Sequence, residues 1–207
     1  MKSPIFTATS SEKALIMTDW LTAHYVEILG VVLSIIYLVL SIRQNIFLWP
    51  VGILSAVMYV IVFFESKFYA DMGLNVYYFV ISIYGWINWS GAARKEQKEP
   101  PVILAGRNRA IFLLLVMVLI FFVIGYLLDH YTDSPIPYWD ALTTSGSIVA
   151  TWMLTRKILE HWIVWIFVDL ISMGLYVYRG LYPTAFLFLV YTTMAVVGYR
   201  AWRRSMQ

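Results

Sequence analysis

The chain matches itself when one copy is shifted by 113 positions, and this internal repeat limits the possible folds more than any other feature. The match needs no gap and includes tryptophan, glycine and arginine pairs, so a chance alignment is a poor explanation. Examples are Arg43 and Arg156, Trp49 and Trp162, Tyr78 and Tyr191, Gly85 and Gly198, and Trp89 and Trp202. Each copy holds three long apolar runs. The sequence therefore predicts a duplicated unit of three helices.

The composition shows which medium surrounds these helices. Hydrophobic residues make up 61% of the chain and charged residues 13%, with a mean hydropathy of +0.73. A soluble domain carries roughly 25% charged residues, so the sequence predicts an integral membrane protein in contact with the lipid bilayer. Aromatic residues reach 17%, and both interfacial belts and a stacking site for a flat ligand would use them. The chain has no cysteine, which excludes disulfides and thiolate chemistry.

Seven segments are apolar over the roughly 20 residues that a bilayer requires. They are residues 25–42, 46–64, 69–89, 109–128, 139–154, 162–178 and 182–202. Residues 1–24 are expected to form a short tail or a surface helix. The two repeats are expected at residues 25–89 and 138–202, and a cytoplasmic loop with a linker helix at residues 90–128.

The odd number of helices fixes the relation between the two copies. A three-helix unit ends on the side opposite to its start, so the single helix at 109–128 restores the direction of the second copy. The sequence thus predicts an all-α fold of seven transmembrane helices, arranged 3+1+3 with parallel repeats. Alternate sides carry four and eleven Lys or Arg residues. Because basic loops stay inside, we expect the N-terminus outside and the C-terminus in the cytoplasm. The net charge of +3 requires no nucleic acid.

Polar groups within apolar segments are candidate site residues, because they are costly in a membrane and usually face the bundle interior. Trp162, Trp165 and Asp169 are spaced i, i+3, i+7, which places them along one face of the sixth helix. Two indoles and a carboxylate suit a flat, partly cationic heterocycle. The alternative is a structural role, in which Asp169 joins a hydrogen-bond network and the indoles lie at the membrane interface.

The third apolar segment carries a second candidate stripe. Asn75, Tyr78 and Ser82 share one helix face, and their polar groups suit a neutral amide or a hydroxyl of a ligand. Residues of these types also commonly join membrane helices to one another. Trp49, the repeat mate of Trp162, is a candidate ligand contact or an interfacial residue.

An intramembrane enzyme is the alternative class of function. The sequence has no paired intramembrane carboxylates and no Gly-x-Ser-x-Gly motif, and its histidines are scattered at His24, His130 and His161. No catalytic residue, metal ligand or cofactor is therefore predicted.

Several motifs together resemble a known family. They are Trp162-x-x-Trp165-x-x-x-Asp169, the stretch from Tyr69 to Tyr78, and Tyr84-Gly85-Trp86-Ile-Asn-Trp89. The chain resembles the Pnu family of bacterial vitamin transporters over about residues 25–204. The resemblance implies a fold similar to that of the SWEET sugar carriers, a central site, and facilitated diffusion of a phosphate-free vitamin through the bacterial inner membrane. It also implies a homotrimer and trapping of the vitamin by a cytoplasmic vitamin kinase.

The substrate within this family depends on Asp169. Family members that carry nicotinamide riboside typically have Asn at this position. A carboxylate suits the amino-pyrimidine or the cationic thiazolium of thiamine better than it suits a nicotinamide amide. Thiamine is therefore the expected substrate. Nicotinamide riboside is the alternative, since its ring also carries a positive charge.

Overall fold

The computed structural model describes residues 28–65, 69–96 and 100–207, and within them the chain forms seven helices. The first is Ile28–Ile42. It is followed by α2 (Leu48–Glu65), α3 (Tyr69–Glu96), α4 (Gly106–Tyr131), α5 (Pro137–Thr155), α6 (His161–Tyr178) and α7 (Tyr182–Arg204). The prediction of an all-α fold is confirmed for this part of the chain. The predicted tail, residues 1–24, lies outside the described residues.

The helix ends differ most from the prediction in the linker between the two repeats. We expected the third helix to end at residue 89, but α3 continues to Glu96. Residues 90–96 contain no proline, so nothing in them stops a helix. Pro100 and Pro101 follow, and proline and the residue before it both disfavour helical continuation. The linker therefore consists of the end of α3 and a non-helical stretch before α4.

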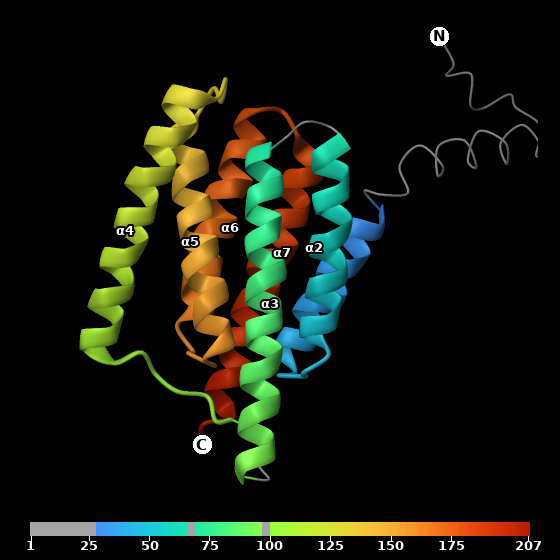
Figure 1. The fold of residues 1–207 in the computed structure, drawn as a ribbon, viewed down its shortest axis with the longest axis vertical. Coiled ribbons are helices and arrows are strands. Elements are labelled where there is room, and N and C mark those ends of the chain that lie inside the picture. Colours follow the sequence, from blue (N-terminus) through green and yellow to red (C-terminus); the bar gives the residue numbers. More distant parts are fainter. Residues whose placement is uncertain (1–27, 66–68, 97–99) are drawn as a thin grey trace, which may run out of the picture.

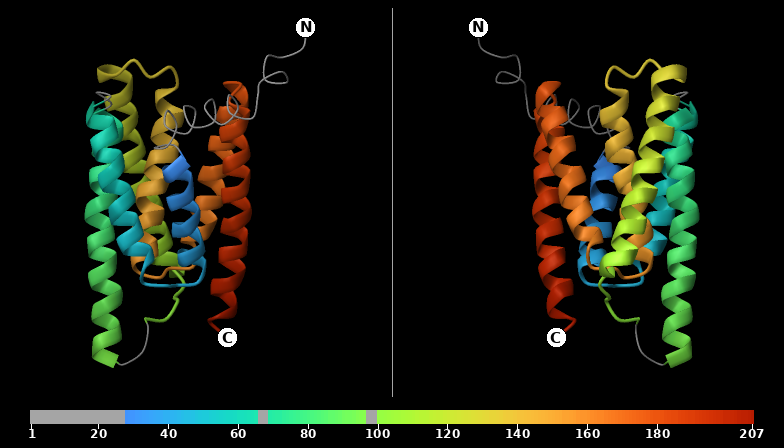
Figure 2. Two further views of the ribbon diagram at one scale, coloured as in Figure 1. Left: turned by 90° about the vertical axis from the view of Figure 1, so that its right-hand side faces the viewer. Right: turned by 90° about the vertical axis from the view of Figure 1, so that its left-hand side faces the viewer.

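The helices run side by side and alternate in direction (Figures 1 and 2). Ile28–Ile42, α3, α5 and α7 run downwards in Figure 1, whereas α2, α4 and α6 run upwards. We call the end where α7 and the chain finish the lower end. Helix α2 packs against α3, and α6 against α7. Helix α5 contacts α3, α4 and α6, so it lies at the centre of the bundle, and α4 lies at its edge.

The exposed surface is apolar, as a membrane environment requires. Helices α4, α6 and α7 are long and apolar enough to span a membrane, and Ile28–Ile42 and Leu48–Phe64 are shorter apolar helices. Only Leu113 and Gly125 of α4 are buried, and most of its large aliphatic and aromatic side chains are exposed. An apolar surface of this extent belongs in contact with lipid or with another protein. By contrast, ten residues of α5 are buried, half of them Ser, Thr or Gly.

Close packing of tryptophan on glycine recurs in both halves of the chain. The indole of Trp49 in α2 lies against Gly85 of α3, where a Cβ atom would come within 2.4 Å of the ring. The indole of Trp162 in α6 lies against Gly198 of α7, where the corresponding distance is 2.6 Å. Both residues of one contact are 113 positions from those of the other. In each half, a side chain larger than hydrogen at the glycine would push the two helices apart.

The loops after Ile28–Ile42 and after α5 also have equivalent backbones. Gln44 and Lys157 are 113 positions apart, and they are the two non-glycine residues of the described chain with positive φ, at 54° and 50°. In both loops the next N–H bonds to a carbonyl five residues earlier, over 2.9 Å from Asn45 to Leu40 and 3.1 Å from Ile158 to Met153.

The contact between Trp162 and Gly198 gives a test of this packing. We expect Gly198→Ala to destabilise the protein by about 1–3 kcal/mol, because the new methyl group overpacks a fully buried ring. The measurement is thermal unfolding of the purified protein in detergent. The control is Gly174→Ala in α6, where an added Cβ would meet nothing within 4 Å. Equal unfolding temperatures for the two variants would contradict this account of the packing.

Candidate functional site

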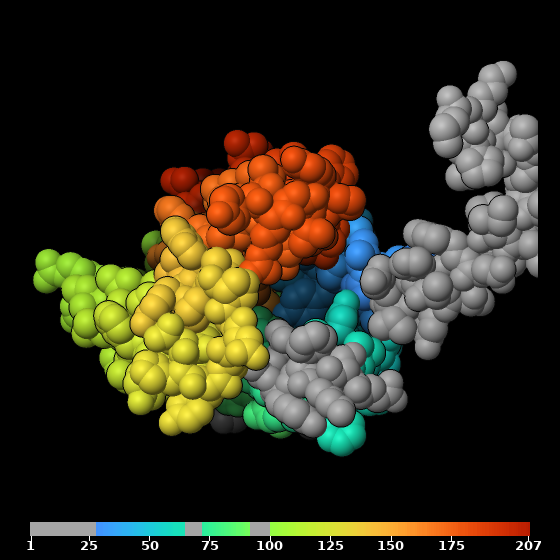
Figure 3. Space-filling view, turned by 90° about the horizontal axis from the view of Figure 1, so that it is seen from above, coloured from blue at the N-terminus to red at the C-terminus, as the bar shows by residue number. Residues whose placement is uncertain are grey.

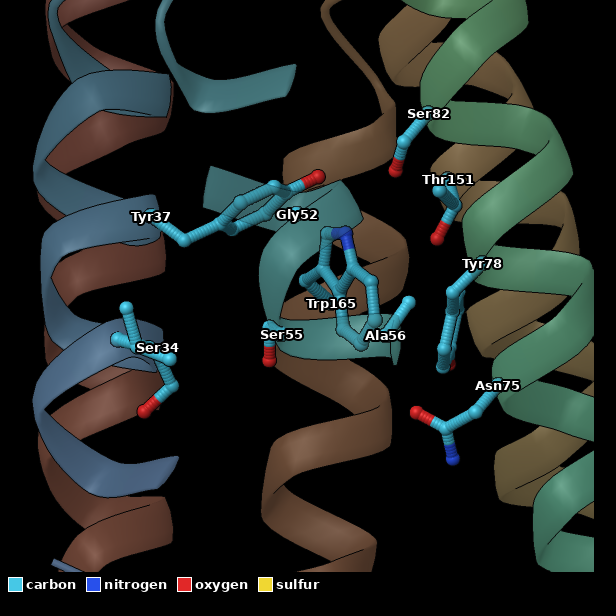
Figure 4. A pocket seen from close by; sticks show the side chains of 11 residues that line it. Ser34, Tyr37, Gly52, Ser55, Ala56, Asn75, Tyr78, Ser82, Thr151 and Trp165 are labelled. Carbon is cyan, nitrogen blue, oxygen red and sulfur yellow. The ribbon is translucent and has the colours of Figure 1, made fainter. Parts of the chain in front are cut away.

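A cavity of about 220 Å³ lies in the middle of the bundle, between the two halves of the chain. Helices from both halves contribute to its wall (Figure 4). The lining residues are aromatic, aliphatic, small or neutral polar. They are Leu33, Ser34 and Tyr37 of Ile28–Ile42; Gly52, Ser55 and Ala56 of α2; Asn75, Tyr78 and Ser82 of α3; Thr151 of α5; and Trp165 of α6.

The stripe predicted on α3 faces this cavity. Asn75, Tyr78 and Ser82 all line it, at the i, i+3, i+7 spacing that places them on one side of the helix. The Tyr78 hydroxyl also hydrogen-bonds to the side chain of Ser147 on α5. Tyr78 therefore joins two helices, as the structural alternative expected, and also presents its ring to the cavity.

Of the three residues predicted to share a face of α6, only Trp165 lines the cavity. Its indole reaches into the space from α6, while Tyr37 and Tyr78 reach in from Ile28–Ile42 and α3 (Figure 4). The spacing of Trp162 and Asp169 is that of a single helix face. However, seven residues span roughly 10 Å along a helix axis, and the cavity meets only the middle of that length.

Trp162 and Trp49 lie in the core below the cavity. Both are fully buried and pack in one cluster with Trp89 and Trp202. Neither lines the cavity, but Trp165, which does line it, packs against their cluster.

Asp169 lies on α6 about one helical turn nearer the upper end than Trp165. Its side chain is 5% exposed and is absent from the lining. It is close enough to Tyr191 of α7 for an electrostatic interaction. The Tyr191 hydroxyl in turn hydrogen-bonds to Ser34, which does line the cavity. This carboxyl group, on which the choice of thiamine depended, is therefore not part of the cavity lining in this structure.

Sequence reasoning missed several lining residues, among them Ser34. It is the repeat mate of Ser147. Each of these serines accepts a hydrogen bond from a tyrosine of the other half, Ser34 from Tyr191 and Ser147 from Tyr78. Each serine donates its own hydrogen to a carbonyl of its own helix over 2.8 Å, which leaves the tyrosine as the donor. Matched serines and tyrosines at the repeat spacing were the available signal. The small residues Gly52 and Ala56 gave none, because they contribute space rather than a polar group.

The two halves differ at positions that line the cavity. Gly52 and Ala56 of α2 line the cavity, and their repeat mates on α6 are Trp165 and Asp169. Small side chains on one helix thus leave room that the indole of the other helix borders. The cavity is therefore asymmetric within a duplicated framework.

The upper end of the bundle is hollowed. Figure 3 views this end and shows a recess between the orange turn from α6 to α7, the yellow segment at the start of α5, and the blue Ile28–Ile42. At the lower end, the tryptophan cluster fills the bundle.

Comparisons with known proteins place the chain in a family. Residues 24–204 match the family described as "Nicotinamide mononucleotide transporter". The chain belongs to this family. It is a membrane transporter rather than an enzyme, and the resemblance to the Pnu family is confirmed.

Individual relatives and a solved structure agree with this assignment. The nicotinamide riboside transporter PnuC of Escherichia coli (strain K12) is 24% identical, over 87% of this chain and 86% of that protein. The riboflavin/roseoflavin transporter RibM of Streptomyces davaonensis is 25% identical, over 85% of this chain and 83% of that protein. A crystal structure of the vitamin B3 transporter PnuC has the same fold, with a TM-score of 0.73 and 20% identity, and covers 93% of this chain and 86% of that one.

The position of Trp165 in the cavity gives a prediction for this transporter. We expect Trp165→Ala to lower the affinity for the transported ligand roughly tenfold, since an indole face contributes about 1–2 kcal/mol to binding a cationic ring in a desolvated site. Calorimetric titration of the purified protein measures this. The control is Phe167→Ala on the same helix, whose side chain is exposed on the outside of the bundle. If the Trp165→Ala variant binds as tightly as the control, the indole of Trp165 is not part of the binding site.

Proposed function

We propose that this protein carries nicotinamide riboside across the bacterial inner membrane by facilitated diffusion, with the central cavity as the binding site. The names of two relatives support a phosphate-free vitamin: nicotinamide riboside for PnuC and riboflavin for RibM. None of the relatives reported above is named for thiamine, so the expectation of thiamine has no support from them. The alternative substrate considered from the sequence fits better.

The observation that carries this proposal is the neutral lining of the cavity. None of its eleven lining residues is charged. Proteins hold phosphate groups with Arg or Lys side chains, or with clustered backbone N–H groups. The cavity offers instead the hydroxyls of Ser34, Ser55 and Ser82, which suit the hydroxyls of a ribose. A nucleoside therefore fits this lining better than a mononucleotide.

Asn75 favours nicotinamide over thiamine. Its amide lines the cavity and can both donate to and accept from the carboxamide of nicotinamide. The aromatic rings of Trp165, Tyr37 and Tyr78 offer faces for the pyridinium ring, which is cationic. The carboxyl group that would prefer an amino-pyrimidine, that of Asp169, lies outside the lining. In this proposal Asp169 acts from about one helical turn above Trp165, by favouring positive charge in the cavity rather than by touching the ligand.

The proposal includes the 3+1+3 arrangement of parallel, SWEET-like repeats, with one repeat at residues 25–89, a linker at 90–128, and the other repeat at 138–202. The reciprocal contacts at the spacing of 113 residues support it, since two parallel halves related by a twofold axis exchange equivalent contacts. The basic residues of the described lower end support a cytoplasmic C-terminus, because Arg43, Arg156, Arg200, Arg203 and Arg204 all lie there. The homotrimer and the cytoplasmic vitamin kinase stay predictions.

Binding of four compounds to the purified protein tests the substrate. We expect nicotinamide riboside to bind most tightly, ahead of thiamine and riboflavin, and nicotinamide mononucleotide to bind at least tenfold more weakly because its phosphate has no basic partner in the cavity. We also expect Asn75→Ala to weaken binding of nicotinamide riboside about tenfold, the loss of roughly 1–1.5 kcal/mol of hydrogen bonding.

The matched control is Asn108→Ala, which changes an exposed asparagine in the first turn of α4. It should bind nicotinamide riboside as the unchanged protein does. Tight binding of thiamine with no binding of nicotinamide riboside would show that the substrate is wrong, while the cavity could still be the site if Trp165→Ala weakens thiamine binding.

A further inference from the structure

The cavity is closed below by a layer of tryptophans. On each of three helices, a tryptophan lies nearer the lower end than a cavity residue. Trp49 and Trp162 lie about one turn below Gly52 and Trp165, and Trp89 lies about two turns below Ser82. Trp202 of α7 completes the layer. We call these four residues the tryptophan plug; none of them is more than 3% exposed. Anything that leaves the cavity downwards has to pass them.

Hydrogen bonds between the two halves hold the plug together. The indole N–H of Trp89 donates to the carbonyl of Thr155 at the end of α5, over 3.1 Å. The indole N–H of Trp202 donates to the carbonyl of Ser41 at the end of Ile28–Ile42, over 2.9 Å. The last helix of each half is thus tied to the end of the first helix of the other half. Trp49 meets Trp89 edge-on at 5.3 Å between ring centroids, and Trp162 meets Trp202 at 5.8 Å.

Gln44 and Lys157 meet beneath the plug. The Lys157 ammonium donates to the side-chain oxygen of Gln44 over 3.1 Å and lies 4.4 Å from the ring centroid of Trp89. The side chain of Lys157 is only 2% exposed. Because these two residues are repeat mates, their contact joins equivalent points of the two halves. Both have the left-handed backbone that non-glycine residues rarely adopt. These two positions therefore carry long side chains although glycine would fit the backbone better.

We propose that the contact between Gln44 and Lys157 is the lower gate of the transport pathway, and that its separation lets the plug open. This inference rests on the proposed function, in that the cavity is taken to hold the transported vitamin. Lys157 and Gln44 are positioning residues here: they hold the plug closed and do not touch the ligand.

The polar atoms of the closed plug suit a gate that opens repeatedly. Trp49 Nε1 and Trp162 Nε1, and Nε2 of His161, whose ring packs against Trp162 and Trp202, are buried without a hydrogen-bond partner among the described residues. Opening would expose these atoms to water, which favours the open form. This reduces the free-energy difference between the closed and the open gate.

The surroundings indicate which side of the gate moves. The linker before α4 holds the Lys157 loop by two backbone hydrogen bonds, from Ile103 N to the Lys157 carbonyl over 3.0 Å and from Leu159 N to the Ile103 carbonyl over 2.9 Å. The Gln44 side chain makes a second contact, from Nε2 to Ser205 Oγ at the end of α7, over 2.9 Å. We therefore expect the loop that carries Gln44 to swing away while the Lys157 loop stays in place.

Cysteine labelling tests the gate, and the natural chain is suitable because it has no cysteine. A reporter Ser55→Cys places one thiol in the cavity. A membrane-impermeant thiol reagent is added to intact cells or to inside-out vesicles, without any vitamin. We expect labelling from the cytoplasmic side to be slow, and to rise at least tenfold when Lys157→Ala is added. Arg156→Ala, the exposed neighbour in the same loop, should leave the slow rate unchanged.

Exchanging Gln44 and Lys157 tests whether their contact, rather than the general stability of the protein, controls the labelling rate. Gln44→Lys alone places two ammonium groups together and should raise cytoplasmic labelling as Lys157→Ala does. Adding Lys157→Gln to it exchanges the pair between equivalent positions and should restore slow labelling. Lys157→Met, which keeps the aliphatic chain, replaces Lys157→Ala if that variant does not fold. Unchanged protection in Lys157→Ala and Lys157→Met, or a swap as open as Gln44→Lys alone, would overturn the proposal.

These outcomes do not depend on which vitamin is carried, because labelling needs none. If the chain inserts in the opposite direction, the two sides exchange their labelling rates but the dependence on Lys157 remains, which still supports the gate. A wrong substrate and a wrong gate therefore give different results.

Discussion

The close contact of an indole with a helix backbone at Gly85 and at Gly198 is the constraint on which the rest of this structure depends. In a membrane, apolar surfaces gain little by leaving lipid for protein, so helices associate through close packing and hydrogen bonds. Glycine removes the side chain that would keep Trp49 and Trp162 away from α3 and α7. The two hairpins, α2 with α3 and α6 with α7, are fixed in this way. Their tryptophans then close the lower end of the bundle beneath the cavity.

Duplication provides the framework, and differences between the copies provide the site. The equivalent contacts between the two halves come from residues that match at the repeat spacing, such as the two serine–tyrosine contacts. The cavity lies where the copies differ: α2 has the small residues Gly52 and Ala56 at the positions where α6 has Trp165 and Asp169. A symmetric pocket would offer both sides of a ligand the same groups. An asymmetric pocket can bind a ring on one side and a ribose on the other.

The sequence predicted the helices and the polar stripe of α3 well, because both follow from local patterns. Apolar length indicates a membrane helix, and the i, i+3, i+7 spacing places Asn75, Tyr78 and Ser82 on one face whatever the surroundings. The spacing does not show which turn of a helix borders a cavity, because that depends on where neighbouring helices cross. For that reason Trp162 and Asp169 share a face with Trp165 but are not part of the cavity lining. The space beside Gly52 could not be inferred either, because it arises from packing between helices.

The most direct test of the central claim is a structure of the protein determined with nicotinamide riboside bound. We expect the pyridinium ring against the indole of Trp165, the carboxamide within hydrogen-bonding distance of the Asn75 side chain, and the ribose near the hydroxyls of the cavity. The tryptophan plug should remain intact below the ligand if the upper end is open. Ligand density against Trp49 or Trp162, with the cavity itself empty, would contradict the assignment of the site.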